Sequence, residues 1–89
     1  MIIKSLHIGI SVMDVDGSIA WYKRNLGFTL VSREYAPTLE TTVAFIRNGE
    51  IEIELFKYKE PKGLPNERGH PNKDLKTTGA KHIALYVVI

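Results

Sequence analysis

Two histidines and a pair of glutamates occur where their side chains could bind a divalent metal ion. His7 and His82 each stand in a stretch of alternating aliphatic residues, and Glu52 and Glu54 stand in a third such stretch. Alternation with a period of two is typical of a β-strand with one buried face, so these polar side chains are expected on the opposite face. Two neutral imidazoles and one carboxylate suit Zn²⁺, Fe²⁺, Mn²⁺, Co²⁺ or Ni²⁺, and three protein ligands leave positions open for water or substrate.

Other interpretations of the same residues remain open at this point. A histidine on the polar face of a strand is usually solvated or hydrogen-bonded. A glutamate such as Glu54 could pair with a basic side chain across the sheet, and the candidates are Arg33, Arg47 and Lys57. Such exposed pairs contribute only about 0–1 kcal/mol. His70 stands between Gly69 and Pro71, which favours a surface loop over a fourth ligand.

A strand and an amphipathic helix are the first elements that would position these residues. Residues 2–12 alternate, with aliphatic residues on one face (Leu6, Ile8, Ile10 and Val12) and His7, Gly9 and Ser11 on the other. Asp14 or Asp16 can cap a following helix, because a carboxylate accepts the free amide hydrogens of the first turn. The helix is indicated by an apolar stripe at three- and four-residue steps, made of Val15, Ile19, Tyr22 and Leu26. Gly27 suits the left-handed residue that ends a helix.

Four further strands are expected. Three of them cover residues 28–35, 41–47 and 50–58, and the pair Asn48-Gly49 predicts a type I′ hairpin between the last two. A loop rich in proline and glycine follows over 59–79, long enough to be a functional flap. The last strand covers 81–89. The order β-α-β-β-β-β predicts an α+β fold in which one helix covers one face of the sheet.

The first and last strands resemble one another. Residues 6–12 and 81–87 both contain His-Ile, then a small residue, an aliphatic residue, one variable position and Val. Such self-similarity can indicate a duplicated unit. A duplicated unit would place a helix after residue 89, as one follows the first copy, but the sequence ends there.

Composition excludes several classes of function. The 89 residues suffice for one domain with a modest core. The net charge of +2 comes from scattered basic residues, which does not favour a nucleic-acid partner. Without cysteine there is neither a disulfide nor a thiolate metal site. No apolar run is long enough to span a membrane and no signal peptide is recognised, so the cytoplasm is the expected location.

Three motifs resemble the vicinal-oxygen-chelate superfamily, which comprises glyoxalase, bleomycin-resistance and dioxygenase proteins. The first, HIGISVMDVDGSIAWYKRNLGF, is similar to the opening strand and Asp-capped helix of that superfamily. IEIELFKY resembles its fourth strand, in which the glutamate before Leu-Phe is the usual ligand, and this selects Glu54 over Glu52. GAKHIALYV is similar to the start of its second module, and the longer segment HPNKDLKTTGAKHIA resembles glyoxalase-I-type members.

The resemblance implies a fold, a metal site and a reaction type. The fold would pair βαβββ modules into a cup-shaped mixed sheet around a divalent metal, held here by His7, Glu54 and His82. The leading function is a metal-dependent, lactoylglutathione-lyase-like enzyme of glyoxalase-I type that acts on a small carbonyl or thiol adduct, with Glu54 also as catalytic base. The alternatives are an extradiol-type Fe(II) dioxygenase, a non-enzymatic antibiotic-binding protein and an inactive fragment. The expected substrate pocket contains Ser11, Phe56, Tyr58 and Tyr86.

One departure from the family pattern bears on assembly. The sequence divides into a βαβββ module (1–58), a loop (59–79) and the first strand of an incomplete second module (80–89), so the strand that usually carries the last carboxylate ligand is absent. Either the sequence is a piece of a longer protein, or another chain completes the site. Two chains could form a homodimer in which each contributes His7 and Glu54 to one cup.

Overall fold

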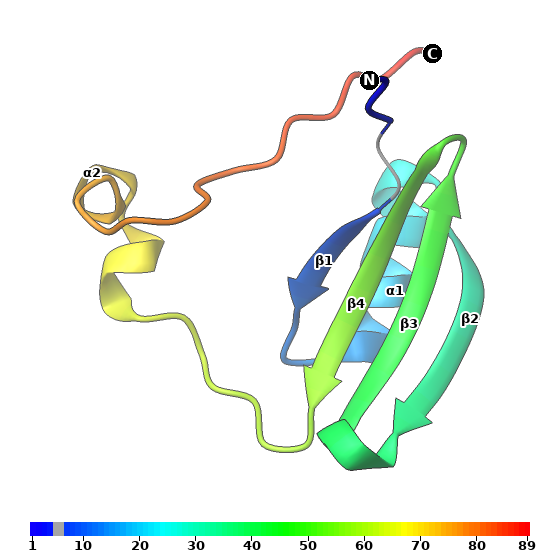
Figure 1. The fold of residues 1–89 in the computed structure, drawn as a ribbon, viewed down its shortest axis with the longest axis horizontal. Helices are drawn as coiled ribbons and strands as arrows, with labels where there is room; N and C mark the ends of the chain where they lie inside the picture. Colours follow the sequence, from blue (N-terminus) through cyan, green and yellow to red (C-terminus); the bar gives the residue numbers. More distant parts are fainter. Residues whose placement is uncertain (5–6) are drawn as a thin grey trace.

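The computed structural model describes residues 1–4 and 7–89. Its main elements are the strands β1 (Ile8–Ser11), β2 (Thr29–Ala36), β3 (Thr41–Asn48) and β4 (Ile51–Tyr58) and the helix α1 (Val15–Leu26). The strands form one sheet in the order β1-β4-β3-β2, and α1 lies across one face of it (Figure 1). Only the β1–β4 pair is parallel. This mixed four-stranded sheet with one helix is the expected α+β, βαβββ module.

β1 is shorter than the strand expected over 2–12. Its register pairs Ile8 with Ile53 and Ser11 with Phe56. Because β4 begins at Ile51, residues 1–4 would extend beyond its first residue and have no ladder partner there. The expected position of Leu6 in this strand lies outside the described residues.

α1 begins and ends at the residues that the sequence indicates. The Asp14 carboxylate accepts a hydrogen bond from the Gly17 amide at 3.0 Å, so Asp14 rather than Asp16 is the N-cap. Asp16 instead forms an ion pair with Arg33 of β2, which ties the helix to the sheet. Gly27 adopts φ +69° and its amide donates to the Lys23 carbonyl at 3.1 Å, the arrangement that commonly ends helices.

The hairpin between β3 and β4 exists, but its turn lies one residue later than expected. Asn48 pairs with Ile51, so the two loop residues are Gly49 and Glu50. Only Gly49 has a positive φ, +59°. Positive φ at the first loop residue alone is the type II′ pattern, so the predicted type I′ turn at Asn48-Gly49 was wrong. Asn48 remains in the strand, and its amide donates to the Leu26 carbonyl at the end of α1 at 2.7 Å.

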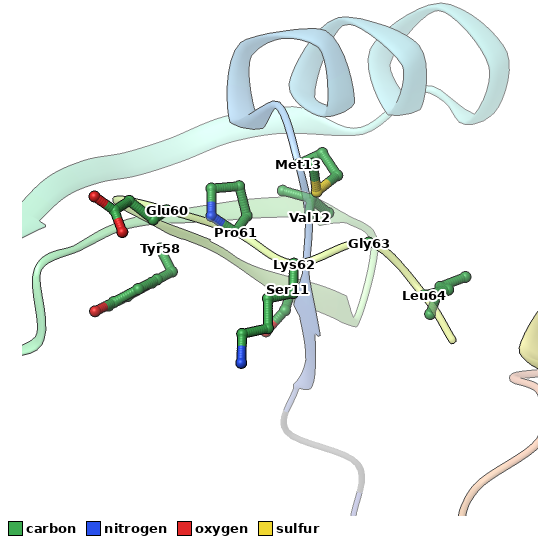
Figure 2. Close-up of a pocket in the computed structure, with 9 residues that line it drawn as sticks. All are labelled: Ser11, Val12, Met13, Tyr58, Glu60, Pro61, Lys62, Gly63 and Leu64. Atoms are coloured by element: carbon green, nitrogen blue, oxygen red, sulfur yellow. The ribbon is translucent and has the colours of Figure 1, made fainter. Parts of the chain in front are cut away.

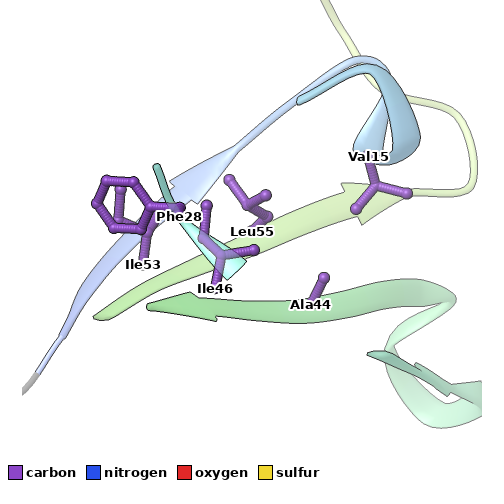
Figure 3. Packing of buried hydrophobic residues seen from close by; sticks show 6 residues of the cluster. All are labelled: Val15, Phe28, Ala44, Ile46, Ile53 and Leu55. Atoms are coloured by element: carbon purple, nitrogen blue, oxygen red, sulfur yellow. The ribbon is translucent and has the colours of Figure 1, made fainter. Parts of the chain in front are cut away.

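The core lies between α1 and the sheet. Alternate residues of β3 and β4 are buried against the helix, and Ile46 and Leu55 are 0% exposed (Figure 3). The other buried apolar residues are Val15, Phe28, Ala44 and Ile53. Because side chains alternate along a strand, burial of this set places Gly9, Phe45, Glu54 and Phe56 on the opposite, open face.

The segment after β4 departs from expectation twice. The 59–79 loop contains two short helical turns, η2 (Asn66–Gly69) and α2 (Pro71–Asp74). The strand expected over 81–89 is absent from the described structure, where residues 80–89 form no ladder with the sheet and are exposed. A strand is stabilised by cross-strand partners, and none of the four described strands pairs with this segment. No helix in the described ranges has the length and apolarity needed to cross a membrane.

Candidate metal centre on the open face

β1 and β4 bring two of the three expected ligands together. His7 directly precedes β1, and Glu54 pairs through the backbone with Gly9 of the same strand. The His7 Nε2 atom lies 3.3 Å from the Glu54 Oε1 atom. The two side chains are 36% and 19% exposed, so both are reachable from the open face while Glu54 is largely covered.

The neighbouring glutamate is engaged elsewhere. The Arg47 guanidinium on β3 donates from Nε and Nη2 to Glu52 Oε2, at 2.9 and 2.6 Å. Arg47 and Glu52 are direct cross-strand partners, which explains this pairing. Geometry therefore distinguishes two residues that alternation alone could not, because Glu54 faces His7 and Glu52 faces Arg47. The alternative pairing of Glu54 with Arg33 or Arg47 is not found, since these arginines bind Asp16 and Glu52.

The separation of the two donor atoms fits a shared metal ion. Ligands about 2.0–2.2 Å from an ion, at tetrahedral or octahedral angles, lie about 2.8–3.6 Å from each other. The 3.3 Å between His7 Nε2 and Glu54 Oε1 falls within that range. Nitrogen and carboxylate oxygen are also the donor types that Zn²⁺ and its first-row neighbours accept. The pair therefore fits two positions of a metal site, although the same distance also suits a direct ion pair.

The third expected ligand is not part of this pair within one chain. His82 lies in the exposed segment 80–89, and the described residues contain no group of three metal-binding side chains. His70 is exposed too, and its backbone amide binds the Glu67 carbonyl at 3.2 Å. The structure thus brings His7 and Glu54 together and leaves His82 apart from them.

Aromatic rings flank the His7–Glu54 pair. The Phe45 ring lies 5.6 Å from the His7 ring at an interplanar angle of 88°, and Phe45 is the cross-strand partner of Glu54. The Phe56 ring covers Gly9, where a Cβ atom would come within 3.1 Å of Phe56 Cε2. The small residue beside the histidine therefore makes room for a ring of the protein itself.

Three of the four expected pocket residues are divided between two hollows, and the fourth, Phe56, lines neither of the two. Ser11 and Tyr58 line a cleft of about 310 Å³ where β1 and β4 end, together with Met13, Lys62 and Leu64 (Figure 2). The Tyr58 hydroxyl donates to the Glu40 carboxylate at 3.2 Å. Tyr86 borders a second hollow of about 580 Å³, between residues 84–89 and the hairpin end of the sheet. The structure therefore brings Ser11 and Tyr58 together and separates Tyr86 from them.

Three contributors to this face were not recognised in the sequence. Phe45 could have been found by extending the alternation to β3, because it lies two residues before Arg47 on the same face. Lys62 could not, since its place in the cleft depends on how the chain turns after β4. Glu40, which accepts the hydrogen bond from Tyr58, has a left-handed backbone with φ +48°. This conformation is uncommon for glutamate and could not be predicted from the residue type.

Comparison with known proteins adds evidence independent of this geometry. The family model for the Glyoxalase/Bleomycin resistance protein/Dioxygenase superfamily matches residues 4–88. Among functionally curated proteins, none matches the chain.

Several solved structures share the fold. The hypothetical protein BH1468 from Bacillus halodurans C-125 is 32% identical over 64% of this chain and 41% of that one, with a TM-score of 0.58. Methylmalonyl-CoA epimerase from Mycobacterium tuberculosis is 30% identical over 67% of this chain and 45% of that one, with a TM-score of 0.56. SMU.1112c is 25% identical over 72% and 48% of the two chains, with a TM-score of 0.57.

The present chain spans less than half of the length of each of these proteins. The matched family model nevertheless covers nearly all of it. With its single βαβββ sheet, the chain belongs to the Glyoxalase/Bleomycin resistance protein/Dioxygenase superfamily.

Proposed function

We propose that the chain carries half of the metal centre of an enzyme that moves a proton at a carbon next to a carbonyl group. The substrate would be a small carbonyl compound or thiol adduct, as for lyases and isomerases of glyoxalase-I type. The observation that carries the proposal is the 3.3 Å approach of His7 Nε2 to Glu54 Oε1 on the open face. The solved relative that is an epimerase of methylmalonyl-CoA supports the same chemistry, because that compound has its stereocentre beside a thioester carbonyl.

In this proposal His7 and Glu54 bind a divalent ion, with His82 as a third ligand. The bound ion would act as a Lewis acid that lowers the pKa of the C–H bond beside the carbonyl. The Glu54 carboxylate accepts the proton and can return it, since β4 holds that side chain in the open face.

A second copy of the chain is the proposed source of the missing ligands. Two modules that face each other would supply His7 and Glu54 from each chain, and His82 would bind in the partner's half-site or compete for the same position. The open face and the uncovered edges of β1 and β2 are consistent with such pairing. This homodimer is a part of the proposal that can fail separately from the metal site.

The test is metal binding by paired histidine variants. We expect His7→Ala to weaken the binding of Co²⁺ or Zn²⁺ at least tenfold, because it removes one of few ligands. His70→Ala should leave affinity unchanged, since that side chain is exposed and remote from Glu54 in the fold. Isothermal titration calorimetry on both variants and the unmodified chain measures this.

Equal effects of the two substitutions would contradict the assignment. The metal that purifies with the protein adds a second criterion. Nickel, cobalt, manganese or zinc would support the lyase or isomerase, whereas iron with sensitivity to oxygen would favour an extradiol-type dioxygenase.

A further inference from the structure

A cluster of charged side chains lies outside the proposed metal centre, directly before His82. The Asp74 carboxylate is 8% exposed although α2, its helix, has only four residues. Its Oδ1 atom lies 3.3 Å from Arg68 Nε and 3.3 Å from Lys81 Nζ. Oδ1 accepts no hydrogen bond from the described residues, so its interaction with the two cations is that of an ion pair.

The two cations also bind backbone carbonyls of Asp74 itself and of the residues after it. The Lys81 ammonium donates to the Asp74 carbonyl at 2.5 Å and to the Thr77 carbonyl. The Arg68 guanidinium donates to the Ala80 carbonyl at 3.2 Å and lies over Gly79, where a Cβ would come within 3.2 Å of Nη2. The cluster therefore joins η2, α2 and the chain up to residue 81 into one unit, which we call the 66–81 lobe.

Apolar burial cannot account for this lobe. Leu75 is 72% exposed, and Leu64, just before the lobe, is 78% exposed. Figure 1 shows the lobe apart from the sheet, joined to β4 by residues 59–65. A buried charge without compensation is costly, so Asp74, Arg68 and Lys81 must remain paired for this arrangement to persist. The backbone hydrogen bonds of the lobe are local to its turns, so the ion cluster is what links η2 to the chain beyond α2.

We propose that Asp74 is a positioning residue for His82. Lys81, bound to Asp74, is covalently linked to His82, so the cluster fixes the point at which residues 82–89 leave the lobe. Because His82 is a metal ligand only in the proposed function, the effect of Asp74 on metal binding rests on that proposal. With the lobe fixed, residues 59–65 are the connection between β4 and the lobe. With the lobe released, residues 59–81 become the connection between β4 and His82.

The expected size of the effect follows from tether length. Releasing the lobe lengthens the connection between β4 and His82 roughly threefold, from residues 59–65 to residues 59–81. This lowers the effective concentration of His82 at a metal site by about fivefold. Asp74→Asn keeps the shape of the side chain and removes its charge, leaving Arg68 and Lys81 to repel each other. We therefore expect about fivefold weaker Co²⁺ binding in Asp74→Asn. In a His82→Ala background the same substitution should have no further effect.

Backbone dynamics provide a measurement that needs no metal. ¹⁵N relaxation should give an order parameter for the His82 amide that falls below about 0.6 in Asp74→Asn, the range of flexible backbone. Lys81→Met should also lower the order parameter of the His82 amide. Lys81→Arg should leave it unchanged because it keeps the charge. Glu67→Gln is the matched control: it removes one exposed carboxylate of the same lobe, and Glu67 forms no ion pair with any described residue.

The outcomes separate this inference from the proposed function. An unchanged His82 order parameter in Asp74→Asn would overturn the inference. So would a loss of Co²⁺ affinity that persists equally in the His82→Ala background. If the unmodified chain binds no Co²⁺, the proposed function falls, and the relaxation data still decide whether Asp74 holds the chain at His82.

Discussion

At the scale of single residues, the two glutamates of β4 share a face and differ in their neighbours. Glu54 meets an imidazole at 3.3 Å, and Glu52 meets a guanidinium at 2.6 Å. The difference arises from register: β1 places His7 beside Glu54, and β3 places Arg47 opposite Glu52. A carboxylate beside an imidazole can bind a metal ion together with it, whereas a carboxylate beside arginine already has its counter-ion.

Matched substitutions test this division. Glu54→Gln should weaken Co²⁺ binding by about tenfold or more, because a neutral amide is a poor replacement for a charged ligand. Glu52→Gln should leave metal affinity unchanged and alter stability by no more than about 1 kcal/mol, since its partner Arg47 is 52% exposed and solvent screens the ion pair. Calorimetric titration and urea unfolding of both variants give the two quantities. A metal affinity that depends on Glu52 instead would show that the wrong carboxylate was chosen.

At the scale of elements, the sequence predicted what depends on local pattern and missed what depends on distant partners. The limits of α1 follow from Asp14 and Gly27, whose effects act within one turn. The hairpin was predicted, but its turn was displaced by one residue because strand pairing keeps Asn48 in β3. The pattern of residues 81–89 is that of a strand, yet no strand among the described residues pairs with it. His82 could therefore be identified as a candidate ligand but not placed.

The helix cap provides a test at this scale. Asp14→Ala removes the acceptor for the Gly17 amide and should destabilise the module by about 1 kcal/mol. For a domain of this size that corresponds to a decrease in Tm of roughly 4–8 °C. Asp14→Asn is the control, because an asparagine side chain caps a helix nearly as well. Thermal unfolding followed by circular dichroism measures both, and equal losses would mean that the carboxylate acts through its charge.

At the scale of the whole molecule, the module is built around one covered face and one open face. α1 covers the first, and the second carries His7, Glu54 and the rings of Phe45 and Phe56. Several large apolar residues are exposed as well, among them Ile83, Tyr86 and Val88 in the segment after the lobe. Exposed apolar side chains and free strand edges favour association with another module.

We expect the chain to form a homodimer at micromolar concentration. Light scattering coupled to size-exclusion chromatography should give about twice the chain mass of 10.1 kDa. Addition of Co²⁺ should shift the equilibrium further toward the dimer if each chain supplies ligands to one site, because metal binding and association are then linked. A monodisperse species of single-chain mass, with and without metal, would exclude a site shared between two copies.

The perpendicular arrangement of Phe45 and His7 also has a spectroscopic consequence. A benzene ring 5.6 Å away generates a local magnetic field that displaces the resonances of the imidazole protons from their usual positions. His7 should thus be distinguishable from His70 and His82 in a proton spectrum without isotopic labelling. Binding of a metal ion or a small molecule beside His7 could therefore be followed through one resolved signal.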